Sequence, residues 1–223
     1  MSVDIRQQLI DAGIVILERD GLPALSVRKL AAEVGTSTMV VYTHFGSMTG
    51  VVDAVAGEAF ARFAQALADV PHTDDPVADF LSIGTAYRRF AIDKPQRYQL
   101  MFGTVAPATL STQRKDLTVT GHAGCSDESF QVLRASVRRL IDAERIRPGD
   151  DAAIAGRIWS VIHGAVMLEM AGFFGHEGHG MIDILGPLAV DMLVGLGDER
   201  ERVEASLAAV ISAAAASAAA GAN

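Results

Sequence analysis

Apolar residues recur at spacings of three and four along most of the chain, the period that is typical of amphipathic α-helices. The first such stripe runs from Ile5 to Leu17, and Gly21 ends the helix that it predicts. A longer stripe, from Val51 to Leu67, follows Ser47, a residue type that commonly caps helix N-termini. The segment from Pro71 to Pro76 then interrupts the pattern. The first part of the chain therefore reads as a group of helices that closes with one long helix.

Further segments keep the helical period after this break. They span residues 77–94, 97–104, 126–147, 150–174 and 181–196, the last with a kink expected at Gly186-Pro187. Residues 106–124 are polar and rich in glycine and threonine, and we expect a mobile loop there. The residues after Gly197 are rich in alanine and offer little to bury, so we expect a partly frayed tail.

The stretch from Ser26 to Met48 carries the strongest signal in the sequence. Ser26 is a suitable N-cap for a helix with the apolar face Val27, Leu30, Ala31 and Val34. Gly35 supplies a tight turn, because glycine tolerates a left-handed backbone, and Thr36 or Ser37 caps a second helix. That helix turns Val40, Val41, Phe45 and part of Tyr42 inward and shows Thr38, Met39, Thr43 and His44 on its outer face. This arrangement is typical of a DNA-binding helix-turn-helix.

In a helix-turn-helix the start of the second helix approaches base edges in the major groove. Those positions here are Thr38, which can hydrogen-bond, and Met39 and Val40, which suit thymine methyl groups. Arg28 can contact a guanine through two hydrogen bonds, but it can also pair with Glu33 or stay solvated. Groups suited to phosphate oxygens belong to Ser26, Ser37, Tyr42, Thr43 and His44. Tyr42 suits packing equally well, and we assign Phe45 to packing.

These residues resemble the DNA-binding domain of TetR-family transcriptional regulators. The resemblance covers Ile5 to about Phe60 and lies above all in Leu25-Ser26-Val27-Arg28, Ala31-Ala32-Glu33-Val34-Gly35 and Val41-Tyr42-Thr43-His44-Phe45-Gly46-Ser47. It implies a homodimeric repressor, less often an activator, which a small molecule releases from or loads onto operator DNA, and it places DNA contacts on the positions named above. Met48 and Thr38 stand where the family often has lysine, so we expect about one phosphate contact fewer per half-site for each.

A second group of residues suggests a ligand pocket. Large side chains on three predicted helices are Tyr98, Met101, Phe102, Phe130, Trp159, His163 and Met167. The last three share one helix face, although such a stripe, histidine included, is also common in a plain helical core. Pro95–Phe102 and Ile158–Gly164 resemble the ligand-binding domain of the TetR subgroup that is marked by Trp, His and Gly. If a ligand binds here, the lining predicts an apolar or aromatic small-molecule effector.

The last two apolar helices carry more apolar surface than one small bundle can hide. The predicted contact residues are Val166, Met170, Leu185, Leu188 and Met192. In the TetR family the corresponding helices pair with those of a second copy as a four-helix interface. Two recognition helices would then enter successive major grooves about 34 Å apart.

Composition and charge restrict the class of protein. The 223 residues carry a formal net charge of −8, which disfavours nonspecific coating of nucleic acid or an anionic membrane partner. Residues 21–50 set two cationic side chains against one acid, so the DNA face is weakly basic and tight binding needs two copies. The single Cys125 forms no internal disulfide, and neither a secretory signal nor a membrane-spanning segment is apparent. We therefore expect a cytoplasmic protein without a membrane partner.

Motifs for metal binding or catalysis are absent from the sequence. His176-Glu177-Gly178-His179 lacks the histidine spacing of a zinc-protease helix, and no phosphate-binding loop or nucleophile elbow occurs. We expect no enzyme, metal or cofactor. The sequence thus predicts an all-α homodimer with a three-helix helix-turn-helix DNA-binding domain at 3–63, a helical ligand-binding and dimerisation domain at 64–197 and a tail at 198–223. Its predicted function is ligand-responsive transcriptional regulation, and the alternative is a helical small-molecule-binding or scaffolding protein with weak or lost DNA binding.

Overall fold

The computed structural model describes residues 4–102, 127–175 and 179–221, and these residues form helices without any strand. The α-helices are Ile5–Asp20 (α1), Val27–Val34 (α2), Thr38–Phe45 (α3), Met48–Ala68 (α4), Pro76–Asp93 (α5), Pro95–Phe102 (α6), Asp127–Asp142 (α8), Asp151–Met170 (α9), Gly186–Leu196 (α10) and Arg200–Gly221 (α11). A short 3-10 helix, Leu22–Ala24 (η1), and a π-helical segment, Gly180–Leu185 (η2), complete the described elements.

The helical architecture confirms the predicted all-α class. The predicted mobile loop at 106–124, Cys125 and the first three residues of His176-Glu177-Gly178-His179 lie outside the described residues. In the parts of the chain that the structure describes, no helix is both long and apolar enough to cross a membrane. The boundary predicted after residue 63 falls inside α4, which continues through it as one helix, so the division into domains stays a prediction.

Serine hydroxyls start the short helices near the N-terminus. Ser26, Ser37 and Ser47 cap α2, α3 and α4, and each hydroxyl accepts a hydrogen bond from the backbone N–H three residues further on. The cap of α3 is thus Ser37 rather than Thr36. Gly35 ends α2 in a left-handed conformation with φ of 72°, which glycine adopts without steric cost. These local signals set the turn between α2 and α3, as the sequence predicts.

The first three helices form a small unit around one apolar core. Leu9 of α1, Leu30 of α2 and Val41 of α3 are all buried in it. A Cβ atom on Gly13 would lie only 2.5 Å from Val55 Cγ2, so the glycine lets α1 approach α4 closely. Helix α3 packs against α2 and α4, with the outer face of α3 turned away from the core.

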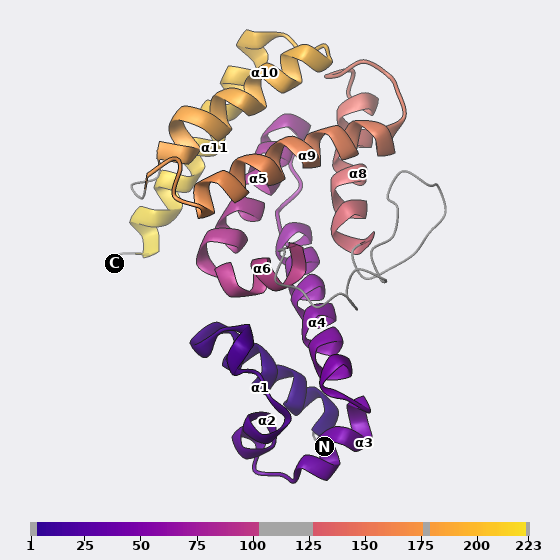
Figure 1. Cartoon of the computed structure of the whole chain (residues 1–223). Coiled ribbons are helices and arrows are strands. Elements are labelled where there is room, and N and C mark those ends of the chain that lie inside the picture. Colours follow the sequence, from indigo (N-terminus) through magenta and orange to yellow (C-terminus); the bar gives the residue numbers. More distant parts are fainter. Residues whose placement is uncertain (1–3, 103–126, 176–178, 222–223) are drawn as a thin grey trace.

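Helix α4 connects this small unit to the larger bundle. Figure 1 shows α4 rising from α1 and α3 at the bottom of the view into the group formed by α5, α6, α8 and α9. Val51 and Val55 in its first half pack into the lower core, whereas Phe63 and Leu67 in its second half are buried in the bundle. A movement of α4 is therefore felt in both parts.

A second connection joins α1 to the corner between α5 and α6. Glu18 of α1 forms ion pairs with Arg97 and with Lys94, the latter at 3.4 Å between Nζ and Oε2. Arg97 belongs to α6, which also packs against α4 and α5. The small unit is thus held to the bundle at two separate points.

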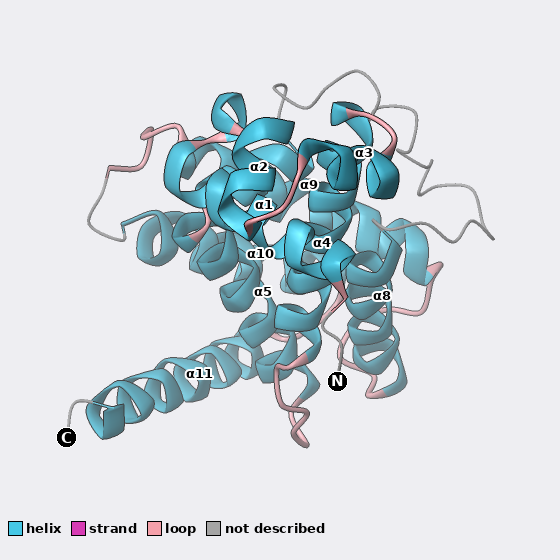
Figure 2. Cartoon of the chain, turned by 90° about the horizontal axis from the view of Figure 1, so that it is seen from below, coloured by secondary structure: helices cyan, strands magenta, loops and turns pink. Residues whose placement is uncertain are grey.

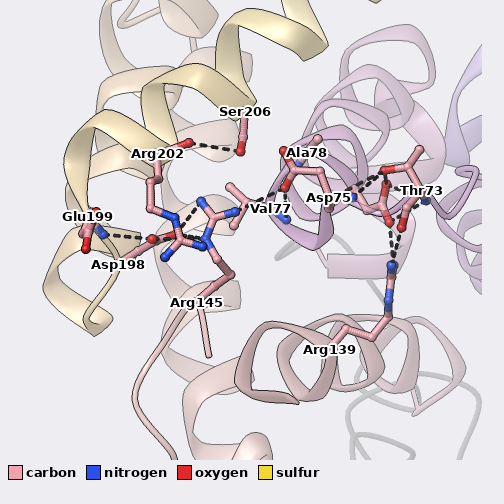
Figure 3. A network of polar contacts seen from close by, with 11 residues as sticks. Thr73, Asp75, Val77, Ala78, Arg139, Arg145, Asp198, Glu199, Arg202 and Ser206 are labelled. Atoms are coloured by element: carbon pink, nitrogen blue, oxygen red, sulfur yellow. Dashed lines mark hydrogen bonds and ion pairs between the residues drawn. The ribbon is translucent and has the colours of Figure 1, made fainter. Parts of the chain in front are cut away.

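Buried ion pairs fix the N-terminus of α5 and the chain before α11 (Figure 3). Asp79 accepts hydrogen bonds from the backbone N–H and hydroxyl of Thr73 and, at 2.6 Å, from Arg139 Nη1 of α8. Arg145 donates through Nε to both carboxylate oxygens of Asp198 at 2.9 and 3.1 Å. Both arginines come from α8 or the turn after it, so this end of α8 organises its neighbours.

Within the predicted tail at 198–223, residues 200–221 form one long helix, α11. Val203 is fully buried and Ser206 nearly so, because the first turns of α11 pack against α5. From Ile211 to Ala216 the side chains are exposed, and Figure 2 shows α11 extending away from the body of the molecule. The expectation of little to bury holds for that distal part and fails for the first turns.

Candidate DNA interface and ligand cavity

The outer face of α3 is open to solvent. The residues predicted to contact DNA from α3 and its cap are all exposed or half-buried: Ser37, Thr38, Met39, Val40, Tyr42, Thr43 and His44. Met39 is 72 % exposed, and Tyr42 is exposed too, which favours a surface contact over packing for this tyrosine. Phe45 packs against the core, as assigned from the sequence. The face presents methyl, thioether, hydroxyl and imidazole groups to a partner.

Arg28 lies exposed on α2 and makes no hydrogen bond or ion pair with the residues that the structure describes. Glu33, a possible partner by sequence, binds Arg19 of α1 instead, with 3.2 Å between Nη2 and Oε2. The neighbouring Lys29 is held by Asp20 at 2.6 Å between Nζ and Oδ2. The Arg28 guanidinium is therefore available to a base or a phosphate.

The hydroxyl groups of this surface differ in whether they have a proton left to donate. Ser26 and Ser37 act as acceptors in their helix caps, which leaves their O–H groups available. Thr43 Oγ1 donates to the Met39 carbonyl at 2.9 Å, so its proton is already used within α3. Met48 is half-buried against the core and brings no charge to a phosphate. The two serines are thus the better phosphate donors.

A cavity of about 430 Å³ lies in the larger bundle. Its walls consist of Phe60, Phe63 and Leu67 from α4, Phe80, Ile83, Gly84 and Tyr87 from α5, Met101 and Phe102 from α6, Ser129, Phe130 and Leu133 from α8, and Trp159, Ile162 and His163 from α9. Most of these side chains are aromatic or aliphatic. A cavity of this size and lining suits a small organic molecule.

Five of the seven predicted pocket residues line this cavity: Met101, Phe102, Phe130, Trp159 and His163. Tyr98 is fully buried behind the wall, where its ring packs on Phe102 with centroids 4.8 Å apart. Met167, one turn beyond His163, packs against the core outside the cavity. The sequence reasoning missed the contributions of α4 and α5, whose apolar residues show the same period as any core helix.

Four side chains form a polar cluster at one end of the cavity. Trp159 Nε1 donates to the Tyr87 hydroxyl at 3.2 Å, and the hydroxyls of Tyr87 and Tyr98 are 2.7 Å apart. His163 Nδ1 lies 2.7 Å from the Tyr98 hydroxyl and 3.1 Å from that of Tyr87. Burial raises the pKa of Tyr87 to about 12, raises the pKa of Tyr98 as well and lowers the pKa of His163. The cluster is therefore uncharged at neutral pH.

The exposed apolar surface near the end of α9 differs from the predicted dimer surface. Val166 and Leu185 are buried in the protomer's own core and expose almost no side chain on its surface, so the predicted role of these two in pairing stays a prediction that the surface of the protomer does not support. Met170, Leu188 and Met192 are half-buried. The exposed apolar residues of this region are Leu168, Phe173, Ile182 and Ile184. They belong to α9, the turn after it and η2, which pack side by side.

Known proteins match both parts of the chain. Residues 9–55 match the family model of bacterial regulatory proteins of the tetR family, and residues 80–193 match that of the tetracyclin repressor-like C-terminal domain. The HTH-type transcriptional regulator Rv1816 of Mycobacterium tuberculosis is 27% identical over 205 residues, covering 78% of this chain and 86% of that protein.

Solved structures share the fold at lower sequence identity. A Rhodococcus sp. RHA1 protein of unknown function superposes with a TM-score of 0.70 at 24% identity, over 88% of this chain and 97% of the other. RolR in complex with resorcinol superposes with a TM-score of 0.63 at 14% identity, over 90% of this chain and 91% of the other. The arrangement of a small helical unit below a larger bundle thus recurs in these proteins.

Proposed function

The chain belongs to the TetR family of bacterial regulatory proteins, and from this premise we propose which parts of it bind DNA, an effector and a second copy of the chain. The protein is a ligand-responsive, DNA-binding transcriptional regulator, and repression by a homodimer is typical of the family. This membership indicates a regulator rather than an enzyme. The proposals concern the residues that contact DNA, the effector and the second copy.

We propose that α3 enters the major groove and that Thr38, Met39 and Val40 meet base edges. Arg28 reaches a guanine or a phosphate from α2, which its lack of an internal partner supports. Ser26 and Ser37 donate their unused hydroxyl protons to phosphate oxygens, while Tyr42, Thr43 and His44 lie along the adjoining backbone. Phosphate contacts of this kind fix the register of the helix, and the base contacts select the operator.

We propose that the cavity binds an apolar or aromatic effector. The observation that carries the regulatory proposal is the double role of α4, which packs on α1 and α3 at its start and lines the cavity with Phe60, Phe63 and Leu67. A ligand that binds one tilt of α4 more tightly than another shifts the balance between two spacings of the recognition helices. RolR, whose fold this chain shares, is known with the small aromatic ligand resorcinol.

We propose that two copies pair through the exposed apolar residues at the end of α9 and on η2. Leu168, Phe173 and Ile182 form this surface, with the half-buried Met170, Leu188 and Met192 as further candidates for contact. Apolar side chains in such a cluster are commonly covered by a partner. Pairing of this kind places two copies of α3 on one face of a duplex.

The DNA-binding proposal is tested by measuring operator affinity after selection of a binding sequence from random duplexes. Fluorescence anisotropy with the selected duplex should show that Arg28→Ala weakens binding roughly tenfold, about the value of one lost base or phosphate contact. Arg89→Ala is the matched control, because Arg89 is an exposed arginine on α5 without an ion pair in the described chain and far from α2. If no duplex is selected, DNA binding has been lost, which leaves a small-molecule-binding or scaffolding protein.

The cavity proposal is tested by filling the cavity with a side chain. Gly84 lines it, and a Cβ atom there has no neighbour within 4 Å, so we expect the side chain of Gly84→Leu to start in open space and to fill part of the cavity. We expect this variant to bind the operator like the wild type and to lose its response to effectors found by screening. Gly156→Leu on α9, also with open space at Cβ but outside the cavity wall, should keep the response. Equal responses of both variants would contradict the assignment of this cavity.

A further inference from the structure

The hydrogen bonds of the polar cluster decide which nitrogen of His163 carries its proton. An indole N–H can only donate, so the Tyr87 hydroxyl is an acceptor from Trp159. If His163 Nδ1 accepts, both tyrosine protons have acceptors, because one hydroxyl donates to the other and that one donates to Nδ1. If Nδ1 carried a proton instead, one of the two tyrosine protons would have no acceptor in the cluster. Buried polar groups rarely stay unpaired, which selects Nδ1 as an acceptor.

His163 Nδ1 is therefore the acceptor at the end of this chain of hydrogen bonds. Burial lowers the pKa of His163, so the ring carries a single proton, and with Nδ1 accepting that proton sits on Nε2. Nε2 has no hydrogen-bond partner among the described residues. It is also absent from the fully buried polar atoms of these residues that have no partner, so the Nε2 atom is accessible. Since His163 lines the cavity, its Nε2–H group faces open space there.

We propose that the effector of this cavity is a neutral, largely apolar molecule with a hydrogen-bond acceptor, such as a carbonyl oxygen, that His163 Nε2–H recognises. The inference rests on the proposed function, because it names the ligand class of the same cavity. Among the described residues that line the cavity there is no Asp, Glu, Lys or Arg, so an ionised ligand would lose its hydration without gaining a counter-charge from them. A ligand that can only donate would meet a fixed donor. The hydrogen bonds to Nδ1 thus fix the Nε2–H group of His163 as a donor, so the ligand has to supply the acceptor.

Two probes of the same shape test this proposal. Benzophenone carries a carbonyl group where 1,1-diphenylethylene carries a carbon–carbon double bond to CH₂, so only the former accepts a strong hydrogen bond. The readout is the indole N–H signal of Trp159 in NMR spectra of the full-length protein, which is unambiguous because the chain has one tryptophan and it lines the cavity. We expect benzophenone to bind roughly tenfold more tightly than the alkene.

Variants of the cluster separate recognition by His163 from simple filling of space. His163→Phe removes the donor and keeps a ring of similar size, so both probes should bind with similar affinity. In the double variant Tyr87→Phe/Tyr98→Phe no hydroxyl donates to Nδ1, the proton is no longer confined to Nε2, and the preference should fall. Either single variant should keep the preference, because the remaining hydroxyl lies within 3.1 Å of Nδ1.

The outcomes distinguish this inference from the function on which it rests. Equal binding of the two probes to the wild type, or tighter binding of the alkene, overturns the acceptor preference and leaves the cavity as a ligand site. If neither probe moves the Trp159 signal of the wild type, both the inference and the cavity proposal are overturned. Circular dichroism of each variant checks that the helices are intact, and the single tyrosine variants serve as controls for the double one.

Discussion

Asp79 shows how one buried side chain ties two helices together. Its side chain is 2 % exposed, and it accepts hydrogen bonds from Thr73 and Arg139. Burial alone opposes ionisation, but these donors outweigh it and hold the pKa of Asp79 below its ordinary value. The carboxylate therefore stays ionised and links the start of α5 to α8.

We predict that Asp79→Asn lowers the free energy of unfolding by about 2 kcal/mol at pH 7, since an amide cannot satisfy all of these donors. Because the pKa is lower in the folded than in the unfolded chain, the stabilisation is complete above the unfolded value of about 3.9 and is lost as pH falls through the folded value. Urea unfolding at several pH values should therefore show a gap between variant and wild type that narrows below about pH 4. Asp11→Asn, which removes a surface partner of Arg62, should change stability by at most about 1 kcal/mol.

Helix junctions place stricter demands on the chain than helix interiors do. Gly50 lies in the first turn of α4, where the end of α3 approaches so closely that a Cβ atom would come within 2.1 Å of the Phe45 carbonyl oxygen. That oxygen belongs to the backbone and cannot turn aside. Glycine at this position sets how α3 is mounted on α4.

We predict that Gly50→Ala moves α3 relative to α4 and destabilises the N-terminal unit by about 3 kcal/mol, the upper range for overpacking. Operator affinity should fall at least about tenfold in anisotropy measurements, because the recognition helix is displaced. Gly195→Ala on α10 is the control, since a Cβ atom there meets nothing within 4 Å. A variant with wild-type affinity and an unchanged thermal unfolding curve would refute this account of the junction.

Sequence reasoning succeeded where the signal is local and was incomplete where it depends on neighbours. The caps Ser26 and Ser47 and the turn at Gly35 are properties of a few consecutive residues, and the structure has helix ends at each. Periodicity reveals which face of a helix is apolar but not which helix covers it. For this reason the pattern could not tell that Phe63 meets a cavity or that Tyr98 lies behind its wall.

The same limit explains the outcome for the dimer surface. The apolar pattern marks Val166 and Leu185 as surface contacts, whereas both side chains are buried inside the protomer. Phe173 follows a helix end and Ile182 lies in a π-helical segment, where the period of the α-helix does not apply. The exposure of these two side chains follows from the positions of α9 and η2 in the fold, which the α-helical period does not predict.

At the scale of the whole molecule, we expect affinity for DNA to depend on two weakly basic faces acting together. The chain carries a net charge of −8, and Lys29 beside Arg28 is already held by Asp20. A single copy thus has few cations to give to phosphates. Linking two such faces raises the affinity for a two-fold site, because binding of the second becomes intramolecular. We therefore expect operator binding by this protein to require the proposed pairing of two copies.

We predict that Phe173→Asp together with Ile182→Asp converts the proposed dimer into monomers. Phe173 is 75 % and Ile182 is 72 % exposed, so the folded protomer should tolerate both substitutions. In the dimer, each aspartate would be buried in the interface without a charged partner, which destabilises the pairing. Analytical ultracentrifugation should show a dimer dissociation constant raised at least about 100-fold, and operator affinity should fall with it. Ile211→Asp on α11 alters an isoleucine that is also well exposed, at 61 %, and should leave both the dimer dissociation constant and the operator affinity unchanged. A double variant that stays dimeric at micromolar concentration would place the interface elsewhere, and monomers that keep full operator affinity would disprove the need for two copies.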